Sequence, residues 1–194
     1  MLFNIITKSF LYVCYNYKSM NNMLRDPHPV KLFVGMLSQD IAFLDKLKDE
    51  LKSVFGPVDM ESHVWEWEHT DYYSKEMGTG LKRQFVFFRD LIDPGTISDI
   101  KLKTIEIEKQ NLKEEGGRRI NLDPGYLDSA KIVLVSTKDF SHRIYLGGGI
   151  YGEVTLIYSG KDYQVLPFTY PDFRTPEYLE VFGEAREKYK RQMK

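Results

Sequence analysis

A strand-length apolar run followed directly by an amphipathic stripe restricts the fold of this chain more than any other feature. The run KLFVGML, Lys31 to Leu37, is a continuous apolar run with the length of a β-strand. Ser38-Gln39-Asp40 then offers helix-capping side chains. From Ile41 to Phe55 apolar residues recur at helical spacing, and Gly56-Pro57 ends the pattern. This β to α step predicts a helix packed on a sheet.

The next segments have the patterns of two further strands. In residues 62–70 two Trp and two His side chains point one way, and two Glu side chains point the other way. Gln84 to Leu91 (QFVFFRDL) has the composition of a strand as well. Because a Glu-bearing face is expected to be wet, we predict an antiparallel sheet with helices on one side only.

A second helical stripe and several short strands follow. Asp93-Pro94-Gly95-Thr96 leads into a helix, Thr96 and Asp99 have capping-box spacing, and Gly116-Gly117 ends this region. Asp123-Pro124-Gly125 suits a type II turn, since Pro fixes φ at the second position and Gly accepts a positive φ at the third. The strands expected in this half of the chain are 118–122, 130–135, 143–146, 153–158 and 163–168.

The order of these elements predicts an α+β fold. The series β-α-β-β-α-β through Val135 resembles a ferredoxin-like split βαβ core. The later strands would extend it as a C-terminal β-meander, and a helix opened by Thr175-Pro176 would cover it. A chain of 194 residues with 42% hydrophobic residues can fill one core. We therefore expect residues 28–194 to form a single α+β domain with a mainly antiparallel sheet.

Residues 1–27 are expected to lie outside this fold. The first residues are apolar and aromatic, but Lys8 and Asn16 interrupt them, and a membrane-spanning helix needs about 18 or more apolar residues. We expect an extension that is disordered or results from a mis-assigned translation start, with Met20 or Met23 as the native start. A weak membrane-associating leader is the alternative.

Charge and cysteine content limit the partners. The chain has 27 Lys and Arg against 28 Asp and Glu, so no global field steers it to nucleic acid or anionic lipid. We expect neither a nucleic acid nor a membrane as partner. Cys14 is the only cysteine, which excludes an internal disulfide and a thiolate-rich metal site and fits the reducing cytoplasm. The oligomeric state is left open.

Four long motifs carry a family resemblance. They are DYYSKEMG (Asp71 to Gly78), NLDPGY (Asn121 to Tyr126), STKDFSHRIYLGGGIYGEVTL (Ser136 to Leu156) and FTYPDFRTPEY (Phe168 to Tyr178). In this order they resemble the bacterial and archaeal family known as domain of unknown function 4416, from Pro29 to the C-terminus. Some members carry the label GTP-binding protein, so the resemblance implies GTP as a candidate ligand.

The common nucleotide motifs do not fit. Gly147 to Gly152 (GGGIYG) satisfies G-x-G-x-x-G, but a strand follows where a dinucleotide site has a helix, which favours a turn. The chain has no G-x-x-x-x-G-K-[ST] loop, so GTP would need a site without a P-loop. His63, His69 and Asp71 could converge on a metal, but His63 shares its face with two Trp and is expected to be packed. We predict no metal site there.

Charged side chains of both signs are concentrated beside the predicted central strand. The candidate ligand-binding residues are Lys138, Arg143, Asp123, Arg118, Asp71, Glu76 and Tyr145, and the candidate catalytic residues are His142 and Glu153. Cationic groups could hold a phosphate while two carboxylates hold Mg²⁺ or orient a hydroxyl. The alternative is a set of ordinary surface pairs that hold loops in place.

These observations favour a cytoplasmic protein that binds a phosphorylated small molecule or nucleotide. The first alternative is a Mg²⁺-dependent enzyme of phosphoryl transfer or phosphodiester hydrolysis, in which His142 or Glu153 moves a proton. The second is an RNA- or protein-interaction module that uses the basic C-terminal helix. The sequence leaves open whether there is catalysis.

Overall fold

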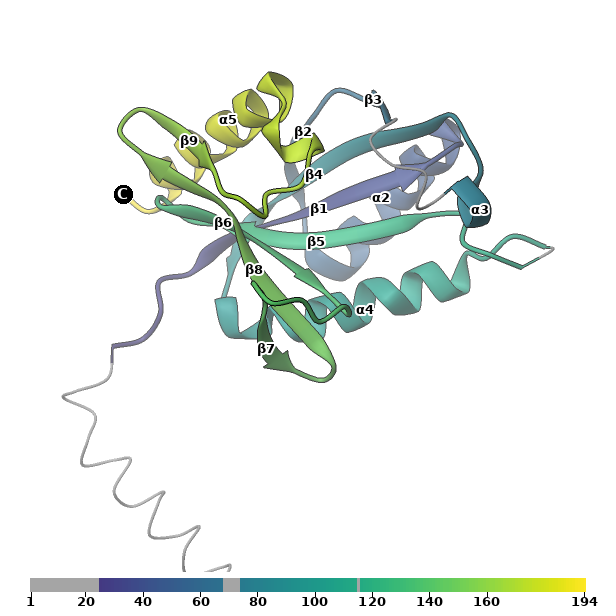
Figure 1. Ribbon diagram of the computed structural model, residues 1–194, viewed down its shortest axis with the longest axis horizontal. Helices are drawn as coiled ribbons and strands as arrows, with labels where there is room; N and C mark the ends of the chain where they lie inside the picture. Colours follow the sequence, from purple (N-terminus) through teal and green to yellow (C-terminus); the bar gives the residue numbers. More distant parts are fainter. Residues whose placement is uncertain (1–24, 68–73, 115) are drawn as a thin grey trace, which may run out of the picture.

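The computed structural model describes residues 25–67, 74–114 and 116–194 (Figure 1). The strands are β1 (Val30–Ser38), β2 (Val58–Glu61), β3 (Trp65–Trp67), β4 (Leu81–Ile92), β5 (Asn121–Leu127), β6 (Lys131–Ser136), β7 (Ile144–Gly147), β8 (Ile150–Ser159) and β9 (Asp162–Val165). The helices are α2 (Ile41–Phe55), α3 (Ser74–Met77), α4 (Ile97–Gln110) and α5 (Pro176–Gln192), with 3₁₀ turns η1 (Pro94–Thr96) and η2 (Asp172–Arg174).

The strands form one open sheet in the order β2-β4-β1-β5-β6-β8-β7, with β3 paired to β4 and β9 paired to β8. Every pairing among the described strands is antiparallel. Helix α2 connects β1 to β2, and α4 connects β4 to β5, so each of these two connections passes over one intervening strand of the sheet. The predicted α+β class with a mainly antiparallel sheet is confirmed.

Helices cover both faces of the sheet, which gives the fold two cores (Figure 1). On one face α2 and α4 pack over alternate residues of β1 such as Val34 and Met36. On the other face α5 packs over Phe33 and its neighbours, with Phe182 at 4.9 Å from Phe33 between ring centroids. The expectation that helices cover one side only is wrong, because the C-terminal helix folds back over the second face.

Two of the predicted helix starts are confirmed and one is wrong. The Asp40 carboxylate accepts a hydrogen bond from Phe43 N at 3.0 Å at the start of α2. Thr175 caps α5, and the residues Tyr178, Phe182, Ala185 and Tyr189 on one face of this helix are buried. Thr96 makes no side-chain cap on α4. Asp93 accepts from Gly95 N instead and shapes the 3₁₀ turn before the helix.

The predicted turn at Asp123-Pro124-Gly125 is wrong, because these residues lie inside β5. They pair with Gly35, Val34 and Phe33 of β1. Pairing of β5 with β6 begins only at Gly125, so Pro124 occupies the free edge that a strand proline tolerates. The real turn between β5 and β6 is at Asp128, whose carboxylate accepts from the next backbone amides.

Two further strand predictions need correction. The strand expected at 62–70 is β3, only Trp65–Trp67 in the described part, and β2 at Val58–Glu61 precedes it. His69 and Asp71 lie outside the described residues. The strand expected at 118–122 is β5, which starts at Asn121. Within the residues that the structure describes, no helix has the length and hydropathy needed to span a membrane.

Candidate functional site

The sheet opens between two central strands. β5 pairs with β6 only over Gly125 to Leu127, whereas β6 continues to Ser136 in pairing with β8. The two strands therefore part on the side of Asn121 and Ser136. We call this opening the β5–β6 notch. It exists because Pro124 cannot donate a hydrogen bond to the ladder where the two strands separate.

Helix α4 satisfies the backbone that the notch leaves open. The Glu108 carboxylate accepts a hydrogen bond from Leu122 N at 2.6 Å, and Lys101 Nζ donates to Leu122 O at 2.7 Å. Two helix side chains thus replace the backbone groups of the missing neighbouring strand. Burial raises the pKa of Glu108, and the nearby Lys101 opposes this shift.

We expect Lys101→Met to lower the free energy of unfolding by about 1–3 kcal/mol, because it leaves a buried carbonyl oxygen without a donor. Lys103→Met is the matched control, since Lys103 lies on the same helix and is about half exposed, at 47% of its side chain. Urea unfolding of both variants measures the difference. Equal losses would contradict the role assigned to Lys101.

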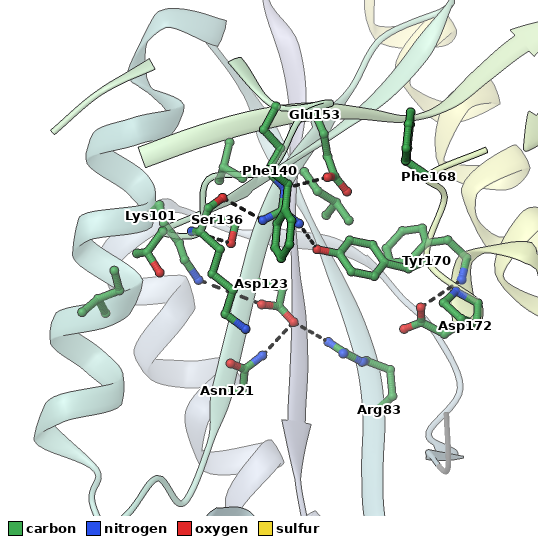
Figure 2. A pocket seen from close by; sticks show the side chains of 18 of the residues that line it. Arg83, Lys101, Asn121, Asp123, Ser136, Phe140, Glu153, Phe168, Tyr170 and Asp172 are labelled. Atoms are coloured by element: carbon green, nitrogen blue, oxygen red, sulfur yellow. Dashed lines mark hydrogen bonds and ion pairs between the residues drawn. The ribbon is translucent and has the colours of Figure 1, made fainter. Parts of the chain in front are cut away.

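A cavity of about 770 Å³ lies at the β5–β6 notch, which is within the size of small-molecule sites at roughly 300–1,000 Å³. Loops that follow β6 and β9 complete its wall (Figure 2). Five Lys or Arg and four Asp or Glu side chains line it, so the wall carries dense charge with a small cationic excess. They are Arg83, Lys101, Arg118, Lys138, Arg143, Glu108, Asp123, Glu153 and Asp172.

One part of the cavity is built around Asp123. Its Oδ2 accepts from Arg83 Nη1 at 3.1 Å and from Asn121 Nδ2 at 2.7 Å, and Lys101 Nζ lies 4.0 Å from Oδ1. Arg83 stands on β4 and reaches across β1 to β5. Gly35 of β1 permits this, since a Cβ there would lie 3.0 Å from Arg83 Nη1. We call Arg83, Lys101, Asn121 and Asp123 the charged end of the cavity (Figure 2).

Because of Asp123, the free energy of unfolding should depend on pH in the acidic range. Burial raises the pKa of this carboxyl, but Arg83 and Lys101 outweigh burial and hold the pKa below its ordinary 3.8. A lowered pKa in the folded state stabilises the fold above the unfolded pKa, and the contribution disappears as pH falls through the folded pKa. The free energies of unfolding of the wild type and Asp123→Asn should therefore differ at pH 7 and converge as pH falls through the lowered pKa of the folded state. A constant difference would contradict this.

A second part of the cavity is built around Glu153. Its Oε2 accepts from His142 Nε2 at 2.7 Å and from Arg143 Nε at 2.8 Å. Arg143 also donates to Lys138 O at 2.8 Å and to the Tyr170 hydroxyl. The Arg143 and Glu153 side chains are 3% and 4% exposed, so this is a buried ion pair. Burial raises the pKa of Tyr170 to about 12, and the hydroxyl stays protonated at neutral pH.

Aromatic rings surround this second group. The His142 imidazole stacks on Phe168 with centroids 4.4 Å apart and planes 4° apart, and it lies 6.1 Å from Phe140 at 18°. Arg143 places its guanidinium carbon 4.8 Å from the centroid of Phe140. We call Phe140, His142, Phe168 and Tyr170 the aromatic end of the cavity.

Six of the predicted site residues come together at the cavity wall. They are Asp123, Arg118, Lys138, His142, Arg143 and Glu153. Glu76 does not line the cavity, but its carboxylate accepts from Arg118 at 2.9 and 2.7 Å and holds that guanidinium in place. The hydrogen bonds from Arg118 lower the pKa of Glu76. Tyr145 lies on β7, outside the cavity lining and 59% exposed, and Asp71 lies outside the described residues.

Several cavity residues escaped the sequence reasoning. Arg83 alternates with Phe85 and Phe87 along β4, so its place on a buried face was readable from the strand pattern. Lys101 and Glu108 fall on the apolar stripe of α4, seven residues apart. A charged residue on an otherwise apolar stripe was the signal that could have identified these cavity residues. The sequence carries no such signal for Asn121, because Asn121 lines the cavity only as a result of the free edge of β5.

Two of the carboxylates at the cavity are paired with cationic side chains. Asp123 is bound by Arg83, and Glu153 is bound by Arg143. Across residues 25–67, 74–114 and 116–194, no three or more His, Cys, Asp or Glu side chains are grouped so that they could hold a metal ion.

Comparison with known proteins gives a family and no close relative of known activity. A family model described as a domain of unknown function (DUF4416) matches residues 28–189. No curated protein and no solved structure matches the chain. The residues matched include every strand and almost all of α5, so the whole cavity wall lies within the matched region.

Proposed function

The chain belongs to the DUF4416 family, a domain of unknown function, and we propose that it binds a phosphorylated small molecule in the cavity at the β5–β6 notch. The observation that carries the proposal is the convergence of five cationic side chains on one cavity of about 770 Å³. Guanidinium and ammonium groups bind phosphate through charge-assisted hydrogen bonds.

The ion pairs of the wall support this role. Asp123 orients Arg83, Glu76 orients Arg118, and Glu153 orients Arg143. Oriented guanidinium groups lose less conformational entropy when they bind an anion than mobile ones. GTP remains a candidate ligand, and it would bind without a P-loop, since the chain has no such loop. We place this binding protein in the cytoplasm, in keeping with its single cysteine.

We also infer a division of the fold that places the cavity. The order β2-β4-β1-β5, with helices connecting β1 to β2 and β4 to β5, is that of a ferredoxin-like core. Strands β6 to β9 then form the C-terminal extension, and α5 covers both parts. The cavity lies where the extension leaves the core, at the free edge of β5.

A thermal-shift screen tests the proposal. Inorganic phosphate, sugar phosphates and nucleotides are added to the full chain with and without Mg²⁺. A ligand at 100 times its Kd stabilises the fold by about 2.7 kcal/mol, which raises the midpoint. We expect Lys138→Ala to abolish the shift and Lys161→Ala to retain it, because Lys161 lies in the β8–β9 turn away from the cavity. A screen with no shift for any phosphorylated compound would refute the proposal.

An enzyme is the second candidate, and the His142–Glu153 pair favours it. A histidine bonded at 2.7 Å to a buried carboxylate has the arrangement of a general base or acid. Such an enzyme would transfer a phosphoryl group or hydrolyse a phosphodiester, with Mg²⁺ entering on the substrate. Turnover of a compound found in the screen, lost in His142→Ala while binding persists, would support it. Binding with no turnover would refute the enzyme and leave ligand binding as the only proposed function.

A further inference from the structure

The two ends of the cavity have different chemistry. The charged end, with Arg83 and Lys101, stands on β4 and α4, whereas the aromatic end comes from the loops after β6 and β9. Figure 2 shows Phe140 and Phe168 at one side of the cavity, with Arg83, Asn121 and Asp123 at the opposite side. A ligand that fills the cavity therefore meets two different surfaces.

The aromatic end leaves an unusual amount of ring surface uncovered. Phe140 is 54% exposed and Phe168 is 58% exposed, although both line the cavity. Their planes are close to parallel with the His142 ring between them. Exposed apolar rings gathered at a cavity commonly mark a binding surface, and a flat ring covers them well by offset stacking.

Glu153 adds a polar feature to the same end. Its Oε1 is buried and has no hydrogen-bond partner among the described residues, while Oε2 is occupied by His142 and Arg143. A buried carboxylate oxygen without a donor is costly. A ring that carries N–H or amino groups could supply the donor, which a purely hydrocarbon ring could not.

We propose that the ligand is a nucleotide whose base stacks on one exposed phenylalanine face at the aromatic end, that of Phe140 or that of Phe168, while its phosphate lies at the charged end. This inference rests on the proposed function and adds the class and orientation of the ligand. Base–aromatic stacking and phosphate binding at cationic groups are independent contributions, so they can be separated by experiment.

Calorimetric titration of the full chain with ribose 5-phosphate and with the four ribonucleoside 5′-monophosphates separates them. We expect at least one nucleotide to bind about tenfold more tightly than ribose 5-phosphate, since one stacked base gives that order of affinity. One of the two substitutions Phe168→Leu and Phe140→Leu should remove this gain, and both should leave ribose 5-phosphate binding unchanged. Tyr145→Leu is the matched control, because Tyr145 is equally exposed but lies outside the cavity lining.

The outcomes distinguish the two proposals. Equal affinity of ribose 5-phosphate and all four nucleotides would overturn the base site and leave phosphate binding in place. A nucleotide preference that survives both phenylalanine substitutions would also overturn it, because the base would then bind elsewhere. If neither sugar phosphate nor nucleotide binds, the proposed function itself fails. Circular dichroism and unfolding midpoints of the variants check that each one is folded.

Discussion

Replacing Gly125 with alanine is expected to lower the free energy of unfolding by about 3 kcal/mol, the upper range for overpacking a core. A Cβ at this position would lie 2.5 Å from the Val133 backbone oxygen and 2.5 Å from Phe33 Cζ. The Val133 oxygen belongs to β6, so it can yield only if β5 and β6 move apart. The substitution thus strains the sheet at the point where the β5–β6 notch begins.

The control for this prediction is Gly183→Ala in α5. A Cβ there would meet no atom within 4 Å, and alanine stabilises a helix interior by about 0.5–1 kcal/mol over glycine. The two substitutions should therefore change the urea midpoint in opposite directions. Small and similar effects would show that β6 does not approach β5 as closely as described.

The second large effect is expected from Glu153→Gln, which should destabilise the protein by about 3 kcal/mol because it leaves Arg143 buried without its anionic partner. The same substitution at Glu106, which pairs with Lys103 on the surface of α4, should leave the unfolding midpoint in place. Chemical unfolding of both variants measures the contrast.

A double-mutant cycle sharpens this result. Arg143→Met combined with Glu153→Leu removes both charges, so the double variant should lose less stability than the sum of the two single losses. Additive losses would mean that the two side chains do not interact in solution. The ion pair would then not be the element that fixes the aromatic end of the cavity.

The helices and strands predicted well from the sequence are those whose local hydrophobic and capping pattern is sufficient to determine their secondary structure. β1 and α2 follow from an apolar run, a capping aspartate and a helical stripe, and α5 follows from Thr175-Pro176 and its buried stripe. Each signal is local, and the tertiary structure agrees with it. The antiparallel sheet was predicted from the alternation of residues 62–70, which gives a strand with one wet, Glu-bearing face.

The prediction failed where partners distant in sequence decide the structure. Asp123-Pro124-Gly125 has the composition of a turn, yet β1 on one side holds it extended. The free edge toward β6 accepts Pro124, and the close approach of β6 requires Gly125. Neither the free edge beside Pro124 nor the close approach of β6 to Gly125 can be predicted from the neighbouring residues in the sequence. The expectation that helices cover one side of the sheet only failed in the same way, because α5 lies more than a hundred residues after β1. Glu66 itself is exposed, as predicted.

In the candidate site too, residues close in sequence were predicted and a contact between distant residues was missed. Lys138, His142 and Arg143 lie in one short loop beside Glu153, so proximity in sequence was a good guide to proximity in space. Arg83 was missed, because its contact with Asp123 spans 40 residues and crosses β1 beside Gly35. Tyr145 was included for its position in the same motif, but β7 turns it away from the cavity.

The central claim is that the cavity at the β5–β6 notch binds a phosphorylated ligand. Nuclear magnetic resonance of the isotope-labelled full chain, titrated with ribose 5-phosphate, tests it most directly because each backbone amide reports its own position. We expect the largest shifts in residues 121–123, 136–143 and 168–173, which border the cavity. Shifts confined to other surfaces, or none at saturating ligand, would contradict it.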